Sequence, residues 1–158
     1  MGEVVRTWRF GSDGHLPLDL VIREPALVGD SLGLKTWGSS YLLAQQLRPM
    51  KDRFPPRLFA PPSRVSVLEL GSGTGLLGLA AAATWQADVV LSDLPEIMPN
   101  LEFNAEANRA AIRSAGGSIR TGAFQWGGPP ETIDLLFSAK NRFPVLLPRL
   151  PLNPGDTC

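Results

Sequence analysis

Three glycines at alternate positions, directly after a short apolar run, constrain the fold of this chain more than any other feature. Residues 65–78 read VSVLELGSGTGLLG, with an acidic residue, Glu69, just before Gly71, Gly73 and Gly75. A stretch rich in leucine and alanine follows, and the next apolar run ends at Asp93. This order predicts a strand, a glycine turn, a helix and a second strand that ends in a carboxylate, as in parallel α/β sheets with nucleotide-like ligands.

Apolar periodicity and turn residues divide the rest of the chain into further elements. We expect strands over residues 7–10, 19–24, 65–70, 87–92, 118–124 and 132–139, and helices over 37–47, 74–85 and 95–114. The first two strands are predicted to form a hairpin or edge strands, the first helix to have Ser39 or Ser40 as its N-cap, and Pro49 to end or bend that helix. The predicted fold is α/β: an incomplete Rossmann-like sheet of four parallel strands with a short N-terminal hairpin and helix.

Proline-rich segments suggest where the chain divides. Residues 54–62 predict a linker, so we expect an N-terminal extension over 1–62 and a Rossmann-like core over 63–139. After Ala139 the sequence KNRFPVLLPRLPLNPGDTC has no sustained period. We therefore expect an irregular tail over 140–158 and a bare sheet edge beside the strand at 132–139.

Composition excludes several classes of protein. The 158 residues are 44% hydrophobic and 19% charged with a net charge of zero, which suits one globular domain and gives no reason to expect nucleic acid or membrane partners. The single histidine, His15, and the single cysteine, Cys158, lie far apart, which argues against a metal site and a cysteine protease. No apolar run resembles a signal peptide, so we expect a cytoplasmic protein, with the nucleus as a second location.

The residues around the glycines discriminate between nucleotide-like ligands. A P-loop requires a Gly-Lys-Ser/Thr sequence, and the glycine segment of this chain has no lysine, so a P-loop is excluded. A dinucleotide motif, G-x-G-x-x-G, is satisfied by Gly73, Gly75 and Gly78, but Glu69 at the strand end would repel a pyrophosphate. The same carboxylate would attract an amino group or a sulfonium, which favours S-adenosylmethionine. Asp93 would then accept hydrogen bonds from the ribose, and Leu94 would lie against the adenine.

Each carboxylate also has a simpler interpretation. Glu69 could be a solvated group at a strand end, and Asp93 could cap the helix that begins near Pro95. Asn104 and Asn108, four residues apart on one helix face, are expected to be structural hydrogen-bonding groups rather than catalytic ones.

Three blocks of sequence, in this order, carry a resemblance to a known family. They are LGLKTWGSSYLLAQQL (32–47), VLELGSGTGLLGLAAA (67–82) and SDLPEIMPNLEFNAEAN (92–108), with a looser match at FQWG (124–127). They resemble class I S-adenosylmethionine-dependent methyltransferases, and more narrowly the seven-β-strand protein-lysine methyltransferases (methyltransferase family 16), including fungal members. With the strand pattern, the resemblance covers about residues 20–139.

The resemblance implies a cofactor, a site and a partner. The cofactor is S-adenosylmethionine, and the protein partner offers a lysine side chain. The cofactor-binding residues implied by the family or expected from the glycine motif are Trp37, Glu69, Gly71, Gly73, Gly75, Asp93, Leu94 and Trp126. In this set Trp37 closes over the methionine end and Trp126 flanks the adenine, although the sequence alone favours a place in the core for both tryptophans.

One departure from the family lies at the end of the expected fourth strand. The family has an Asp-x-x-Tyr motif there, whereas this chain has Lys140 and Phe143 at the two positions. The change after Ala139 is typical of a truncated or spliced product and equally of a gene-prediction artefact. Three functions therefore stay open: a protein-lysine methyltransferase, a non-catalytic remnant or cofactor-binding module, and a small-molecule N-methyltransferase. No residue is assigned as a catalytic base.

Overall fold

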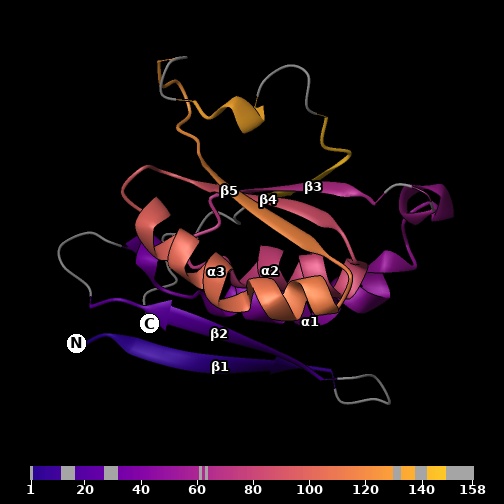
Figure 1. Ribbon diagram of the computed structural model, residues 1–158, viewed down its shortest axis with the longest axis horizontal. Coiled ribbons are helices and arrows are strands. Elements are labelled where there is room, and N and C mark those ends of the chain that lie inside the picture. Colours follow the sequence, from indigo (N-terminus) through magenta and orange to yellow (C-terminus); the bar gives the residue numbers. More distant parts are fainter. Residues whose placement is uncertain are drawn as a thin grey trace.

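The computed structural model describes residues 2–11, 17–26, 32–60, 62, 64–129, 133–137 and 142–148. The strands are β1 (Val4–Phe10), β2 (Leu18–Glu24), β3 (Ser66–Leu70), β4 (Asp88–Asp93), β5 (Ser118–Ala123) and β6 (Val145–Pro148), and the α-helices are α1 (Gly38–Lys51), α2 (Leu76–Trp85) and α3 (Met98–Ser114). Short 3₁₀ helices span Leu32–Leu34, Pro56–Phe59 and Leu135–Phe137. These elements form layers, with the four-stranded sheet on one side of the helices and the β1–β2 hairpin on the other (Figure 1).

The central sheet is parallel and has the strand order β5–β4–β3–β6. Its register aligns Thr121, Leu91, Glu69 and Leu147 in one row across the four strands. Because side chains alternate along a strand, this row shares a face with the row of Ile119, Val89, Val67 and Val145. Most of these residues are buried, and they form much of the core. The expected α/β fold with four parallel strands is confirmed.

Helix α2 lies in the middle of the molecule and is apolar on every side. Nine of its ten residues are buried, in keeping with the run LLGLAAAA. A helix that is apolar all round has to be covered on all sides. Helix α2 packs against α1, α3, β4 and β2, so it contacts both the sheet and the hairpin.

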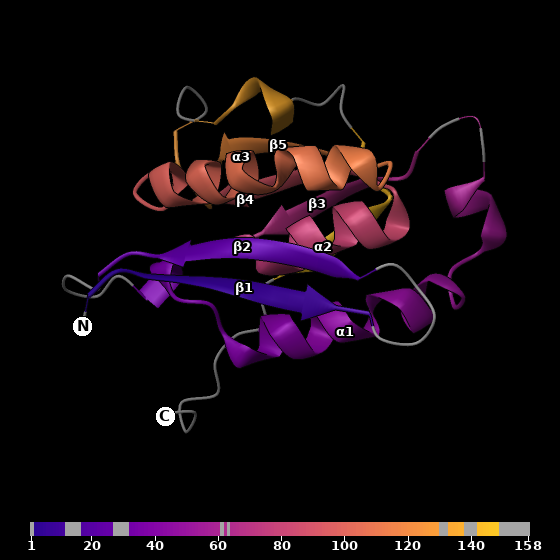
Figure 2. The same ribbon diagram turned by 60° about the horizontal axis from the view of Figure 1, so that its bottom comes forward.

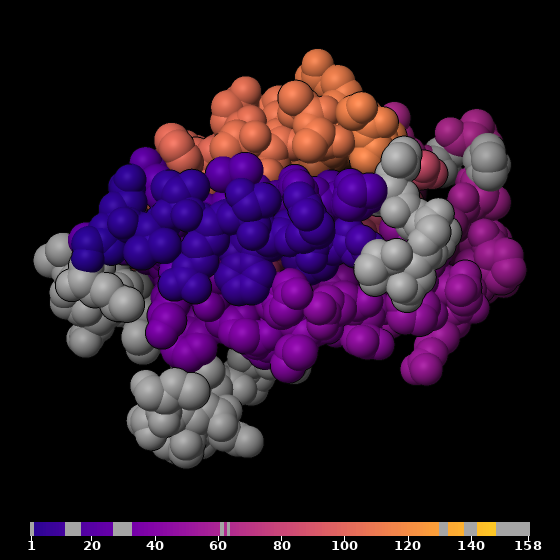
Figure 3. Space-filling view, turned by 90° about the horizontal axis from the view of Figure 1, so that it is seen from below, coloured from indigo at the N-terminus to yellow at the C-terminus, as the bar shows by residue number. Residues whose placement is uncertain are grey.

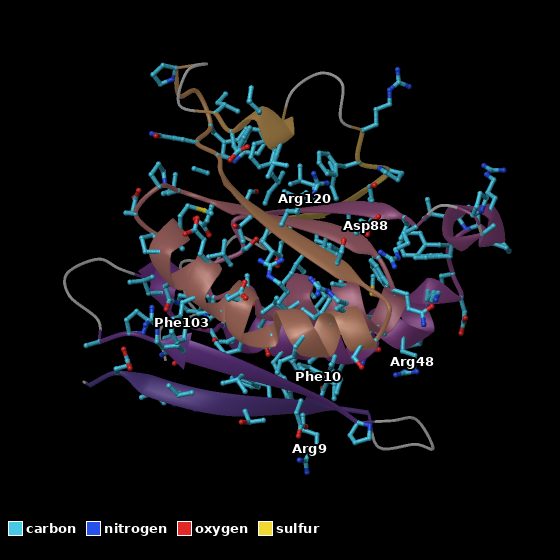
Figure 4. The ribbon with its side chains drawn as sticks, viewed as in Figure 1. Arg9, Phe10, Arg48, Asp88, Phe103 and Arg120 are labelled. Atoms are coloured by element: carbon cyan, nitrogen blue, oxygen red, sulfur yellow. The ribbon has the colours of Figure 1, made fainter. Side chains whose placement is uncertain are left out.

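The β1–β2 hairpin is antiparallel and lies over the helices. The space-filling view shows its strands between α3 and α1 (Figure 3), and the tilted ribbon gives the same arrangement (Figure 2). Its side chains alternate: Phe10 points toward the helices and Arg9 points away from them (Figure 4). Phe10, Leu20 and Ile22 belong to the core, whereas Arg9 forms an exposed ion pair with Asp19 at 2.7 Å. The predicted hairpin is thus confirmed.

The fourth strand of the sheet does not come from the predicted segment. Residues 133–137 form a turn and a 3₁₀ helix, and the strand beside β3 is Val145–Pro148, in the expected irregular tail. Asp134 explains the first difference, since its Oδ1 accepts a hydrogen bond from the Leu136 amide at 2.9 Å and its carbonyl accepts one from the Phe137 amide. Such local side-chain bonds compete with strand pairing. The edge of β3 is covered instead by the short apolar run at 145–148.

Smaller differences concern helix ends. Helix α1 begins after Trp37, which occupies the N-cap position without a side-chain hydrogen bond, so neither Ser39 nor Ser40 is the cap. Pro49 lies inside its last turn and does not end it. Helices α2 and α3 begin two and three residues later than predicted, at Leu76 and Met98. The proposed boundaries at residues 62 and 139 remain predictions.

Candidate functional site

The three glycines between β3 and α2 all have left-handed backbone conformations. Their φ angles are 70° at Gly71, 57° at Gly73 and 86° at Gly75. Residues with a Cβ atom rarely adopt such angles, so the loop requires glycine at these positions. The loop lies at the carboxyl ends of β3 and β4, where ligands bind in open parallel sheets.

Close neighbours add a second requirement for glycine. A Cβ atom on Gly73 would lie 2.9 Å from the carbonyl oxygen of Gly33, and one on Gly75 would lie 2.8 Å from Cδ1 of Leu101. The loop is therefore enclosed by the segment before α1 on one side and by α3 on the other. The sequence blocks at 32–47, 67–82 and 92–108 meet here in space.

Asp93, at the end of β4, is bonded directly to the glycine loop. Its Oδ2 accepts a hydrogen bond from the Gly73 amide at 2.6 Å, and its Oδ1 accepts one from the Leu94 amide at 2.8 Å. A carboxylate has about four acceptor positions, so these two bonds leave capacity for two hydroxyl groups. The alternative role of Asp93 as a helix cap is absent, because α3 begins after Ile97 with no side-chain cap.

Glu69 lies beneath α2, and its side chain is almost completely enclosed. The residue is 5% exposed, and its Oε2 accepts a hydrogen bond from the Gly78 amide at 3.1 Å. Burial raises the pKa of this carboxyl group to about 8, and the nearby Asp93 carboxylate adds to the rise. The interpretation of Glu69 as a solvated carboxylate is therefore wrong.

The burial of Glu69 changes how it would act on a ligand. Gly78 is the third residue of α2, and its amide is one of the donors that a helix N-terminus leaves unpaired. A phosphate at this position would compete with the Glu69 carboxyl group for that donor. Glu69 thus pairs with one of the donors that a phosphate at this helix N-terminus would use. Direct contact of Glu69 with a cofactor remains a prediction.

Two serines join the ends of β3 and β4. Ser92 Oγ donates to the carbonyl of Glu69 at 2.6 Å, and Ser72 accepts from the Ser92 amide through its Oγ at 3.0 Å. The Ser72 amide in turn donates to the Ser92 carbonyl at 2.9 Å. These bonds continue the strand pairing into the loop and fix its position relative to Asp93. Neither serine was expected from the sequence to belong to the site.

Apolar side chains follow β4 and β5 at the end of the sheet where the glycine loop lies. Leu94 is exposed just after Asp93, and Trp126 is 74% exposed beside Phe124, with ring centroids 5.1 Å apart. A place in the core is thus excluded for Trp126. Phe137 also contacts Phe124, at 5.2 Å between ring centroids. Trp37 is half-buried at the start of α1, next to Thr36, which contacts the loop.

Lys140, His15 and Cys158 lie outside the described residues, whereas Phe143 is described and half-buried. Among the residues that the structure describes, no group of three histidine, cysteine, aspartate or glutamate side chains could hold a metal ion. No helix in the described ranges is long and apolar enough to cross a bilayer.

Comparison with known proteins identifies the family to which this chain belongs. A family model described as lysine methyltransferase matches residues 17–140, which include the glycine loop, Asp93 and the hairpin strand β2. The chain belongs to the lysine methyltransferase family. The resemblance inferred from the three blocks is thereby confirmed.

Individual relatives agree with the family model. The chain is 36% identical over 114 residues to protein-lysine N-methyltransferase rrg1 of Schizosaccharomyces pombe, which covers 72% of this chain and 35% of that protein. It is 34% identical over 145 residues to protein-lysine N-methyltransferase EFM2 of Saccharomyces cerevisiae, which covers 84% of this chain and 33% of that protein. EEF1A lysine methyltransferase 3 of Mus musculus is 36% identical over 90 residues, and this match covers 51% of this chain and 37% of that protein. This lysine methyltransferase family member thus spans about a third of the length of these curated relatives.

Proposed function

We propose that this chain binds S-adenosylmethionine at the carboxyl ends of β3 and β4 and functions in methyl transfer to a lysine side chain of a protein. The observation that carries the proposal is the bond between Asp93 and the Gly73 amide, 2.6 Å long, which joins the carboxylate at the end of β4 to the glycine loop. Family membership supports the cofactor, and the relatives from the two yeasts, which are protein-lysine N-methyltransferases, support a protein lysine as acceptor.

The described residues fit this cofactor. S-adenosylmethionine has a ribose with two hydroxyl groups, an adenine and a positively charged methionine part, and it has no phosphate. Asp93 retains acceptor capacity for the hydroxyl groups, and Leu94 and Trp126 provide apolar surface for the adenine. Glu69 occupies the first-turn amide of α2 that a phosphate of a dinucleotide would use.

The chemistry would require positioning more than acid–base catalysis. The cofactor supplies an activated methyl group, so the protein has to orient the acceptor amine in line and exclude water. A lysine must lose its proton before it attacks, and its ordinary pKa is about 10.4, so burial or an acceptor group has to assist. We assign no residue of this chain to that role.

A second candidate is a cofactor-binding module that does not transfer the methyl group. It is favoured by the strand beside β3, which comes from residues 145–148, after the positions where the family has its Asp-x-x-Tyr motif. Lys140 and Phe143 stand at those two positions. The acceptor side would then be changed while the glycine loop and Asp93 are kept.

Binding can be tested by titration calorimetry with S-adenosylhomocysteine, with NADH as the competing ligand class. Asp93→Asn is expected to weaken binding of S-adenosylhomocysteine by about 1–3 kcal/mol, because charge-assisted hydrogen bonds to the ribose are lost. The control is Asp88→Asn at the amino end of the same strand, which should leave the affinity unchanged. Binding of NADH in preference to S-adenosylhomocysteine would reject the proposed cofactor.

Transfer is tested separately with S-adenosylmethionine that carries a labelled methyl group. Label in lysine residues of lysate proteins would support methyl transfer. Binding of S-adenosylhomocysteine without any transfer would instead support the cofactor-binding module. Label recovered only in small molecules would favour an N-methyltransferase with a small acceptor.

A further inference from the structure

A row of three asparagines on α3 lies along the outer edge of β2. Asn100, Asn104 and Asn108 are spaced by four residues, which places them on one helix face. All three are buried, and Asn104 is 0% exposed. Buried amides have to be hydrogen-bonded, and their partners show that these side chains link separate parts of the fold.

Two of the asparagines bond to β2 as a neighbouring strand would. Asn108 accepts from the Val21 amide and donates to the Val21 carbonyl, both at 2.8 Å. Asn104 accepts from the Arg23 amide at 2.9 Å and donates to the Arg23 carbonyl at 3.1 Å. An edge strand normally leaves such groups unpaired. Side-chain amides of α3 thus satisfy the backbone hydrogen-bonding groups at the edge of the hairpin.

Asn104 makes one further bond, which Asn108 does not share. Its Nδ2 also donates to the carbonyl oxygen of Thr74, in the glycine loop, at 3.0 Å. The third bond of Asn108 stays within α3, where its Nδ2 donates to the Asn104 carbonyl. The orientation of the Asn104 side-chain amide is fixed. If its oxygen and nitrogen were exchanged, the oxygen would face two carbonyl oxygens and the NH₂ group would face the Arg23 amide. Asn104 therefore joins β2 to the loop through one planar group.

A second connection reaches the same loop residue from Glu24, the last residue of β2 and the neighbour of Arg23. Glu24 accepts through Oε1 from the Thr36 amide at 3.1 Å, and the Thr36 hydroxyl contacts the Thr74 hydroxyl at 2.8 Å. Both threonines are buried. The hairpin is thus linked to Thr74 twice, through Asn104 to the Thr74 carbonyl and through Thr36 to the Thr74 hydroxyl.

We propose that the β1–β2 hairpin is part of the cofactor site, with Asn104 and Thr36 as positioning residues that hold Thr74 and thereby set the shape of the glycine loop. This inference rests on the proposed cofactor. Neither positioning residue touches the ligand; both act through the Thr74 backbone and hydroxyl. The consequence is that damage to the hairpin, which lies outside the parallel sheet, weakens cofactor binding.

The first test compares Asn104→Ala with Asn108→Ala. Each variant removes two hydrogen bonds between α3 and the backbone of β2. The two variants should therefore lose similar stability, measured by urea unfolding. Only Asn104→Ala also releases the loop carbonyl. We expect its affinity for S-adenosylhomocysteine to fall about tenfold or more, with Asn108→Ala within about twofold of the original chain. Equal affinities in the two variants would overturn the inference.

The second test uses the hydroxyl pair and has an internal rescue. Thr36→Val removes the hydroxyl that contacts Thr74 and keeps the shape of the side chain, whereas Thr36→Ser keeps the hydroxyl. We expect weaker binding of S-adenosylhomocysteine for Thr36→Val and recovery for Thr36→Ser. Loss of affinity in both variants, or in neither, would contradict the role assigned to Thr36.

A third measurement needs no ligand and separates this inference from the proposed function. Amide hydrogen exchange of the ligand-free chain reports opening of the loop through the amides of Ser72, Gly73 and Gly75, which are hydrogen-bonded. Asn104→Ala should speed their exchange relative to Asn108→Ala. Faster exchange without any cofactor binding would reject the function and retain the coupling. Unchanged exchange would reject the coupling whatever the ligand.

Discussion

Two regions of this molecule differ in what holds them in place. From β3 through α3 the chain is densely buried, and the glycine loop, Glu69 and Asp93 are bonded to backbone groups on several elements. From residue 133 to 148 the described residues have few such bonds, with Leu135 86% exposed and Leu146 56% exposed. The comparison shows that the glycine loop and its carboxylates are held by many bonds to neighbouring elements, whereas the last strand depends on pairing with the edge of β3.

The sheet itself offers a matched pair that tests this difference. Leu91 in β4 and Leu147 in β6 lie in one row, on either side of Glu69. We expect Leu91→Ala to reduce the free energy of unfolding by about 2–5 kcal/mol, because it opens a cavity in the interior of the sheet. Leu147→Ala should cost about 2 kcal/mol or less, since an edge strand can relax toward solvent. Urea unfolding of both variants measures this, and equal losses would remove the distinction between the regions.

The glycine loop can be compared with an ordinary surface turn. Gly75 and Gly127 both have positive φ angles, but a Cβ atom would meet Leu101 at Gly75 and nothing within 4 Å at Gly127. We expect Gly127→Ala to cost about 1–2 kcal/mol from backbone strain alone. Gly75→Ala should cost more, because steric overlap is added. Thermal unfolding checks the order, and a Gly75→Ala variant as stable as Gly127→Ala would show that the loop is less constrained than its contacts imply.

Buried Glu69 gives the first region a dependence on pH. Its pKa of about 8 lies above the ordinary value of 4.5, so the folded chain binds a proton that the unfolded chain has released between these values. The stability contributed by this group is fully present below about pH 4.5 and is lost as the pH rises toward about 8, with a slope of at most about 1.4 kcal/mol per pH unit.

Glu69→Gln isolates this contribution, because glutamine can still accept the bond from Gly78 but does not titrate. Urea unfolding at pH 6 and pH 8 should show a smaller loss of stability for Glu69→Gln than for the original chain. The same loss in both chains would mean that Glu69 titrates as an ordinary carboxyl group.

The first region could be predicted from sequence and the second could not, for physical reasons. Glycines that need positive φ, a strand ending in Asp93 and an apolar helix are local signals, and they located β3, α2 and β4 to within a few residues. In residues 132–139 the apolar run indicated a strand, but the side chain of Asp134 stabilises a turn that periodicity does not reveal. The four residues of β6 are too few for a recognisable period, and they become a strand only by pairing with β3.

The candidate site divides in the same way. Asp93 and the glycines were predicted and lie together, whereas the burial of Glu69 beneath Gly78 depends on how α2 packs on β3. Asn104 was expected to be a structural group, and its bonds confirm this. Its contact with Thr74 could not be inferred, because it requires the relative positions of α3, β2 and the loop.

Trp126 should give the smallest change in stability and thereby separates the site from the fold. Its ring is largely exposed and contacts Phe124 edge to face. We expect Trp126→Ala to change the free energy of unfolding by less than about 1 kcal/mol, since little buried area is lost. If Trp126 flanks the adenine, the same variant should nonetheless weaken binding of S-adenosylhomocysteine, and Trp126→Phe should recover part of the affinity.

Calorimetry and urea unfolding on the same samples therefore give two independent answers. Weaker binding with unchanged stability would show that an exposed aromatic side chain outside the densely bonded loop belongs to the cofactor site. Unchanged binding would restrict the site to the glycine loop, Asp93 and Leu94, and the apolar surface around Phe124 would then have no part in holding the adenine. In that case the cofactor site would end with β5, and no residue after β5 would contribute to it.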